Sequence, residues 1–179
     1  MSDPSSFFLA ESARLGETAA RGPVVDLACG RGRHALAAAE LGARVLGLDR
    51  NPALLRELRV EARSRRLPLL TVRTDLETPH AIPVRSGSCG AILVFCFLFR
   101  PLALPICEAL APGGLLLYET FTIRQRDLGQ KPTNTAFLLQ EGELPELFGE
   151  LQILSYWEGL TEGPRPQAMA RLVARKGAC

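Results

Sequence analysis

Short apolar runs alternate with segments of helical periodicity along most of this chain. Strands are predicted at 23–27, 44–48, 69–73, 91–97 and 115–119, and helices between them at 32–41, 52–65 and 102–110. This alternation is typical of βαβ units, in which helices cover both faces of a parallel sheet. After a short helix at 143–149, two last strands at 152–156 and 169–174 are joined by a connection too short for a helical crossover, which predicts an antiparallel pair. The pattern indicates the α/β fold class.

The length and composition suit one domain, 1–179. A hydrophobic fraction of 47% is enough for a proper core, and a formal charge of +2 is too small to indicate nucleic acid or an anionic membrane as a partner. The most apolar run, 91–99, is far shorter than the ~20 residues of a membrane helix, and no signal-peptide pattern precedes the first strand. We therefore expect a cytoplasmic protein.

The cysteines and histidines lack the spacing of a metal site. No Cys-x-x-Cys pair occurs among the five cysteines, which are Cys29, Cys89, Cys96, Cys107 and Cys179. The two histidines are His34 and His80. We expect reduced thiols and no bound metal.

A glycine-rich turn joins the first predicted strand to its helix and indicates a cofactor site. The segment from Gly30 through Gly32 to Ala35 fits the dinucleotide fingerprint G-x-G-x-x-A, in which a helix N-terminus holds a pyrophosphate. Asp26, at the end of the strand, argues for a different ligand, because its carboxylate would repel a pyrophosphate and attract the ammonium of a methionine moiety. The alternative is that Asp26 only caps the turn.

Acidic residues also end the next two strands. A carboxylate at Asp49 can accept hydrogen bonds from both ribose hydroxyls of an adenosine, whichever cofactor carries it. Asp75 could accept from an adenine amino group while Leu76 packs on the ring, although Asp75 could also be a simple turn residue. Because open α/β sheets bind ligands at the carboxyl ends of their strands, three acidic strand ends in succession predict an adenosine site.

With these motifs the chain resembles the class I S-adenosylmethionine-dependent methyltransferases over nearly its full length, in the tellurite-resistance-like branch. The resemblance rests on the turn Asp26-x-Ala28-x-Gly30-x-Gly32 and on the segments 92–102, 112–121 and 134–148. Ala28 stands where the family has its first glycine, and Cys96 and Phe99 stand where the branch more often has Asn and His.

The resemblance implies a single Rossmann-like domain with a doubly wound, mostly parallel seven-stranded sheet. The implied strand order is 3-2-1-4-5-7-6, with strand 7 antiparallel. S-adenosylmethionine is then the cofactor and S-adenosylhomocysteine its product. The predicted cofactor-binding residues are Asp26, Ala28, Cys29, Gly30, Gly32, Asp49, Arg50, Asp75, Leu76 and Phe95.

The resemblance implies methyl transfer to a small acceptor, which could be a thiol, a chalcogen oxyanion or another small molecule. The candidate catalytic residues are Cys96, Phe99, Arg100, Tyr118 and Glu119. Tyr118 and Glu119 are candidates for a general base, and Arg100 could hold an anionic substrate or form a surface ion pair. We expect a monomer or homodimer with no nucleic-acid or membrane partner.

Two segments outside the predicted sheet have expected roles beside the acceptor. Residues 1–20, which include Phe7 and Phe8, could form a lid helix or pack against the sheet, and 121–142 is an irregular substrate-side segment. Two other functions stay open from the residues alone. One is a non-catalytic module that binds S-adenosylmethionine, and the other is an NAD(P)-dependent oxidoreductase that uses Gly30, Gly32 and Ala35.

Overall fold

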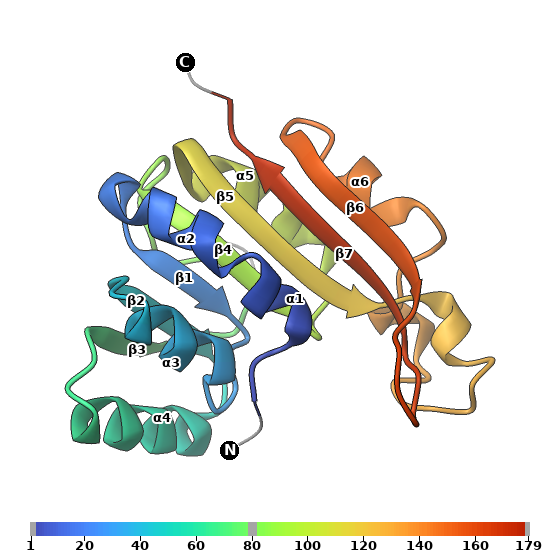
Figure 1. The fold of residues 1–179 in the computed structure, drawn as a ribbon, viewed down its shortest axis with the longest axis horizontal. Coiled ribbons are helices and arrows are strands. Elements are labelled where there is room, and N and C mark those ends of the chain that lie inside the picture. Colours follow the sequence, from blue (N-terminus) through green and yellow to red (C-terminus); the bar gives the residue numbers. More distant parts are fainter. Residues whose placement is uncertain (1–2, 79–81, 178–179) are drawn as a thin grey trace.

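A seven-stranded sheet organises the computed structural model, which describes residues 3–78 and 82–177 (Figure 1). The sheet has the order β3-β2-β1-β4-β5-β7-β6. Its strands are β1 (Val24–Leu27), β2 (Val45–Asp49), β3 (Leu69–Arg73), β4 (Cys89–Phe95), β5 (Leu110–Phe121), β6 (Gln152–Leu160) and β7 (Ala168–Arg175). β7 is antiparallel to both β5 and β6, and the pairings from β3 to β5 are parallel. The predicted fold class, strand order and antiparallel strand are confirmed.

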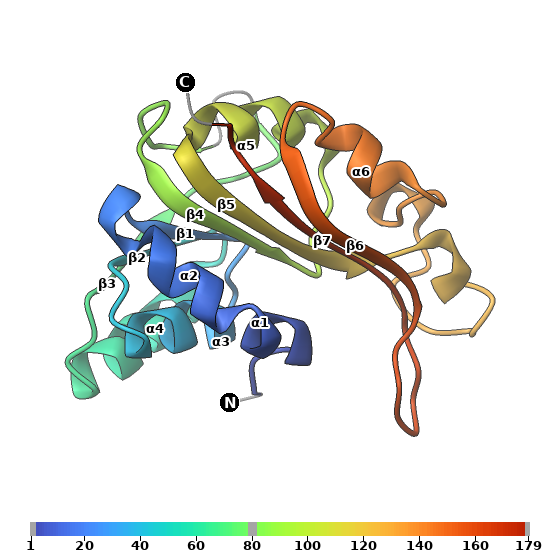
Figure 2. The same ribbon diagram turned by 45° about the horizontal axis from the view of Figure 1, so that its top comes forward.

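Helices cover both faces of this sheet, as Figures 1 and 2 show. One face carries α1 (Ser6–Ala10), α2 (Ser12–Thr18), α3 (Arg33–Glu40) and α4 (Pro52–Ser64), and the other carries α5 (Ala103–Ala109) and α6 (Glu143–Leu147). Short 3₁₀ turns lie at η1 (Ala19–Arg21), η2 (Arg100–Leu102), η3 (Ile123–Gln125) and η4 (Thr135–Phe137). No helix among the residues described is both long and apolar enough to cross a bilayer.

The central strand β4 is buried along its whole length because it has helices on both faces. Ile92 and Val94 belong to the core under α5, and Leu93 and Phe95 belong to the core under α1 and α3. The uninterrupted apolar run of β4 therefore contributes side chains to two cores, one on each face of the sheet. This explains why the run reads in the sequence as a strand without alternation.

Several strand boundaries differ from the sequence expectation, including the end of β6 at Leu160 instead of residue 156. β4 spans Cys89–Phe95 instead of 91–97, because Cys96 has a left-handed backbone (φ 55°) that ends the strand. Phe97 consequently leaves the sheet and lies in the following loop. β5 begins at Leu110, earlier than predicted, and the proline and two glycines expected to separate helix from strand are part of it.

The helix after β2 begins as the sequence predicts. The Asn51 side chain accepts hydrogen bonds from the backbone N–H groups of Ala53 (3.0 Å) and Leu54 (3.4 Å), and Pro52 occupies the first turn. This cap satisfies backbone donors that a helix end otherwise leaves free, so a local motif determines where α4 starts.

The N-terminal segment forms two short helices in place of one. Phe7, Phe8 and Leu15 are buried in the same apolar cluster as Val24 and Phe95. The aromatic side chains of α1 therefore pack onto the sheet, as one of the two sequence alternatives expected. Whether α1 also closes over a ligand stays a prediction.

Gly90 provides a test of how closely this N-terminal segment approaches β4. A Cβ at Gly90 would lie 2.5 Å from the Thr18 carbonyl oxygen and 2.6 Å from that of Gly22. Both atoms are backbone, so Gly90→Ala should lower the free energy of unfolding by about 1–3 kcal/mol, the usual cost of overpacking. Chemical denaturation followed by circular dichroism measures this change.

Gly16→Ala is the matched control, because a Cβ at Gly16 in α2 meets no atom within 4 Å. Replacing a helical glycine in open space should raise the free energy of unfolding by about 0.5–1 kcal/mol. Equal effects of the two substitutions would contradict the close approach of α2 and η1 to β4.

Candidate active site

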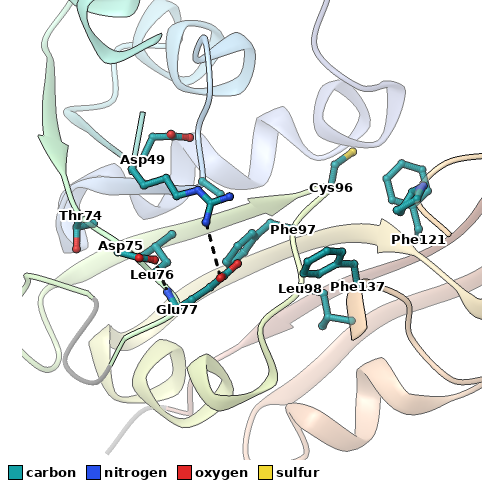
Figure 3. Close-up of a pocket in the computed structure, with 13 residues that line it drawn as sticks. Asp49, Thr74, Asp75, Leu76, Glu77, Cys96, Phe97, Leu98, Phe121 and Phe137 are labelled. Atoms are coloured by element: carbon teal, nitrogen blue, oxygen red, sulfur yellow. Dashed lines mark hydrogen bonds and ion pairs between the residues drawn. The ribbon is translucent and has the colours of Figure 1, made fainter. Parts of the chain in front are cut away.

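A cavity of about 270 Å³ opens at the carboxyl ends of the parallel strands (Figure 3). It lies where the connections from β1 and β4 diverge, the position at which open α/β sheets bind ligands. Its lining residues come from strand ends and from the segment after β5: Ala28, Asp49, Arg50, Thr74, Asp75, Leu76, Glu77, Cys96, Phe97, Leu98, Phe121, Pro132 and Phe137.

The turn after β1 is held tightly against its neighbours. Ala28 has φ 54°, which is unusual for a residue with a side chain and costs on the order of 1 kcal/mol or more. Gly32 has φ 76°, and a Cβ there would lie 2.4 Å from the Leu58 side chain of α4. Glycine at 32 therefore lets the turn and α4 approach closely. Cys29, half-buried behind the turn, donates its backbone N–H to the Leu48 carbonyl at 2.9 Å.

Asp49 lines the cavity with its carboxylate oriented by two backbone donors. One oxygen accepts from the N–H of Gly30 and the other from the N–H of Asn51, both at 2.8 Å. A carboxylate oxygen can accept more than one hydrogen bond. Asp49 therefore joins the turn after β1 to the end of β2 and still has acceptor capacity for a ligand hydroxyl.

Asp26 is buried behind the same turn, and its Oδ2 has no hydrogen-bond partner within the described structure. Burial raises the pKa of Asp26 to about 7, and the nearby Asp49 carboxylate adds to the rise. The backbone N–H of Ala35 and the guanidinium of Arg33 act in the opposite direction. A buried carboxylate oxygen without a partner is unusual in a folded protein, and Asp26 is not among the residues that line the cavity.

The polar end of the cavity is built from residues after β2 and β3. Asp75 is exposed, and its Oδ1 accepts a hydrogen bond from the Glu77 N–H at 3.0 Å. Asp75 therefore also acts as a turn residue, which was the alternative interpretation of the sequence. Leu76 is buried beside it. Arg50 and Glu77 form an ion pair at 3.8 Å, drawn as a dashed line in Figure 3.

Of the five candidate catalytic residues, Cys96 is the one that lines the cavity. Its backbone N–H donates to the Glu119 carbonyl at 2.8 Å, which joins the end of β4 to β5. Its sulfur lies 3.9 Å from Nη2 of Arg33. Desolvation raises the pKa of the Cys96 thiol although the guanidinium opposes this, so the thiol is not activated as a nucleophile.

The two candidates for a general base are already engaged by the protein. The buried Tyr118 hydroxyl donates to the Phe97 carbonyl at 3.0 Å, and burial raises its pKa far above the ordinary value. The buried Glu119 carboxylate accepts from Nε of Arg171 at 2.7 Å. Neither side chain lines the cavity.

Phe99 and Arg100 lie after the end of β4 but outside the cavity lining. Phe99 packs against the core under α5. Arg100 forms an ion pair with Glu143, so the ion-pair alternative for this residue is what the structure shows. The Phe95 ring lies on the face of the sheet covered by α1 and α3, where it stacks on His34 with 3.7 Å between ring centroids.

His34 is bound within the N-terminal side of the fold. Its Nε2 accepts from the Ser5 N–H at 3.2 Å, and burial lowers its pKa to about 3. No group of three metal-ligating side chains occurs in 3–78 or 82–177, and His80 and Cys179 lie outside the described residues.

Several cavity residues were missed by sequence reasoning. Thr74 and Glu77 flank Asp75 at a strand end that was already suspected, so position alone could have found them. Phe121, Pro132 and Phe137 come from the segment 121–142, which has no periodicity to predict where any side chain points. They depend on the tertiary path of the chain.

Comparison with known proteins identifies the family. A family model described as a methyltransferase domain matches residues 24–114, which include the turn after β1 and the ends of β2, β3 and β4. The chain belongs to this methyltransferase family. The expected class I S-adenosylmethionine-dependent methyltransferase is thereby confirmed, with S-adenosylmethionine as the methyl donor, and the oxidoreductase alternative is set aside.

Solved structures show the same fold at low sequence identity. TehB from Haemophilus influenzae is 22% identical over 93% of the methyltransferase, with a TM-score of 0.75, and the methyltransferase spans 62% of TehB. A protein of echinomycin biosynthesis, solved in a study of the conversion of a disulfide bond into a thioacetal group, is 20% identical with a TM-score of 0.72, over 98% of this chain and 82% of that one.

Geranyl diphosphate C-methyltransferase from Streptomyces coelicolor A3(2), in complex with Mg²⁺, geranyl diphosphate and S-adenosyl-L-homocysteine, is 17% identical with a TM-score of 0.67. The alignment covers 94% of the methyltransferase and 77% of that chain. No curated protein sequence matches the chain. These likenesses establish the fold and leave the acceptor open.

Asp49→Ala tests where the methyltransferase binds the adenosine part of its cofactor. Loss of a charged acceptor for ribose hydroxyls should weaken S-adenosylhomocysteine binding by roughly 1.5–3 kcal/mol, measured by isothermal titration calorimetry. Asp49→Asn, which keeps one oxygen for the Gly30 N–H, should lose less. Asp127→Ala, in an exposed loop, is the control. An unchanged affinity in folded Asp49→Ala would mean that the adenosine lies elsewhere.

Proposed function

We propose that this methyltransferase methylates a soft nucleophile, a thiol or a reduced chalcogen, on a small acceptor, as a member of the tellurite-resistance-like branch. The observation that carries the proposal is the state of the ionisable groups at the ends of β4 and β5. Tyr118 donates to a carbonyl, Glu119 is paired with Arg171, and Arg100 is paired with Glu143. A soft nucleophile ionises near neutral pH and needs no base from the protein, whereas an alcohol or amine does.

The residues of the site fit S-adenosylmethionine. The unpaired buried oxygen of Asp26 provides a partner for the methionine ammonium, and Asp49 retains acceptor capacity for the ribose hydroxyls. Asp75 and Leu76 provide an acceptor and an apolar surface for the adenine. Ala28 and Gly30 leave the turn with at most a methyl group beside the ligand, and Gly32 lets the turn pack against Leu58.

The chemistry needs alignment more than proton transfer. S-adenosylmethionine supplies an activated methyl group: the acceptor sulfur donates the electron pair of the new carbon–sulfur bond, the old bond's pair stays with S-adenosylhomocysteine, and the thiol proton passes to solvent. The chain's own residues exclude water and align the two reactants. Apolar Phe97, Phe121 and Phe137 suit the first of these tasks.

The structural neighbours as a group leave the acceptor open, but two of them are consistent with the proposal. TehB, the namesake of the proposed branch, matches with a TM-score of 0.75, and the echinomycin protein acts where a disulfide becomes a thioacetal. We extend the proposal to the two flanking segments. α1 and α2 would close the methionine side of the site, and 121–142 would contact the acceptor, a small molecule.

A panel of acceptors tests this function directly. Purified protein with S-adenosylmethionine should release S-adenosylhomocysteine when given benzenethiol, hydrogen sulfide or hydrogen selenide, and mass spectrometry should detect the methylated product. Phenol serves as the matched oxygen acceptor and should react at least about a hundredfold more slowly, the usual contribution of a missing general base. Equal rates with phenol would contradict the proposal. Cofactor binding without turnover on any acceptor would support the non-catalytic module.

The raised pKa of Asp26 predicts a pH dependence of cofactor binding. The pKa lies near 7 in the free protein, and an ammonium ligand favours the ionised carboxylate, so below pH 7 binding must first remove a proton. Affinity for S-adenosylhomocysteine should therefore rise between about pH 5.5 and 7.5, by up to about tenfold per unit, while the ligand amine with a pKa of about 8 stays charged. Titrations in two buffers of different ionisation enthalpy measure the released proton.

Asp26→Asn should remove both the pH slope and the proton release. The amide keeps the size of the side chain and cannot titrate in this range. A slope that persists in folded Asp26→Asn would assign the proton to another group and remove Asp26 from the ammonium site.

A further inference from the structure

The cavity has a polar end and an apolar end. In Figure 3, Asp49, Asp75 and Glu77 lie on one side, and Phe121, Phe137 and Leu98 lie on the other. The polar end belongs to β2 and β3, whose residues we assign to the adenosine. The apolar end, with Cys96 and Phe97 beside it, is left for the acceptor.

The charges around the cavity discriminate between acceptor classes. Arg50 is the one basic residue in the described lining, and it lies at the polar end, paired with Glu77. Three carboxylates, Asp49, Asp75 and Glu77, line the same cavity. Outside the lining, Nη2 of Arg33 lies 3.9 Å from the Cys96 sulfur, so a single thiolate beside Cys96 can gain a cation. An oxyanion against Phe137 would lose its hydration and would also face the negative charges of the polar end.

Phe137, which we call with its neighbours 136–139 the wall of the apolar end, is exposed although its side chain is large and apolar. Its side chain lines the cavity and is 45% exposed, whereas the next two residues, Leu138 and Leu139, are fully buried. The backbone around it is anchored. Asn134 caps the η4 turn through the Ala136 N–H at 3.0 Å, and Leu139 bridges to Thr122. The chain therefore holds an aromatic surface open toward the cavity.

Arg100 fixes this wall to the end of β4. Its guanidinium donates to both carboxylate oxygens of Glu143, with Nη2 at 2.8 Å from Oε2. It also donates to the carbonyls of Leu138 at 2.9 Å and Ala136 at 3.2 Å, the two neighbours of Phe137. The Glu143 carboxylate accepts the Gln140 N–H at 2.7 Å as well. A planar fork makes these contacts together, which a lysine cannot do.

We infer, on the basis of the proposed function, that the acceptor is a thiol with an apolar hydrocarbon part and no ionisable group besides its sulfur, that Phe137 determines this specificity, and that Arg100 is the positioning residue for Phe137. The acceptor's hydrocarbon part packs against Phe137 at the apolar end. Its sulfur then lies toward the methyl donor. Thiols that carry a second anionic group, and chalcogen oxyanions, are disfavoured by the three carboxylates and by the lack of an unpaired cation in the described lining.

The first test compares acceptors of different charge on Phe137→Ala. Benzenethiol should be preferred to 2-mercaptoethanesulfonate and to selenite, and the variant should raise the KM for benzenethiol by about tenfold, as expected for loss of an aromatic contact surface. Affinity for S-adenosylhomocysteine should stay within about twofold. Val60→Ala, which removes an exposed apolar side chain from α4, is the control and should leave both values unchanged.

The second test separates positioning from simple stability. Arg100→Lys keeps the charge and loses the fork, so it should raise the KM for benzenethiol while kcat changes less and cofactor affinity is retained. Arg65→Lys is the matched control, because Arg65 also forms ion pairs with two carboxylates, those of Glu61 and Glu40, but on the surface. A merely structural role of Arg100 would lower the melting temperature and cofactor affinity without a selective rise in KM.

A binding measurement makes the inference independent of turnover. Calorimetric titration of benzenethiol and of selenite into protein saturated with S-adenosylhomocysteine should show binding of the thiol alone, weakened in Phe137→Ala. If the thiol binds in this way but is never methylated, the proposed function fails and the inference about the wall stands. Three results would each overturn the inference. They are equal or tighter binding of selenite or the sulfonate, no binding of the thiol, and thiol binding that is unchanged in Phe137→Ala.

Discussion

The parallel pairing of β1 with β4 is the contact on which the rest of the structure depends. It places Leu27 opposite Val94 in the middle of the sheet, so the two chains leave their strands side by side. Each strand is followed within two residues by a non-glycine residue in the left-handed region, Ala28 with φ 54° and Cys96 with φ 55°. Such conformations persist only where the surroundings hold them, and here the burial of both strands does so. The cavity lies between these two turns.

The cofactor end of this cavity is held in an electrostatically costly arrangement. Asp26 is buried without a partner for one oxygen, close to the carboxylate of Asp49, and its pKa rises to about 7 as a result. Asp49 in turn is stabilised by two backbone N–H groups. The protein therefore has one carboxylate stabilised by its own backbone and another, Asp26, whose Oδ2 has no partner within the described residues. A preformed site of this kind favours a cation beside the glycine-rich turn.

The acceptor end depends on a different type of interaction. An irregular segment with no apolar periodicity becomes a defined wall because Arg100 joins it to the end of β4, and because Gln125, buried after β5, accepts the Ala168 N–H at 2.8 Å. These hydrogen bonds between side chains and backbone groups hold the segment in place, as strand pairing holds the sheet. The polar and apolar halves of one cavity thus have separate structural origins.

Local sequence patterns are sufficient to predict several features of the fold. The alternation of apolar runs with helical patterns predicted the sheet and its helices, and Asn51 with Pro52 predicted the start of α4. Of the three acidic strand ends, Asp49 and Asp75 line the cavity. Which strand-four and strand-five side chains face the cavity depends on long-range packing. The left-handed backbone at Cys96 places Phe97 outside the sheet. Arg100 is paired with Glu143, which lies 43 positions further along the chain. Such contacts depend on the folded path of the chain, which sequence periodicity does not contain.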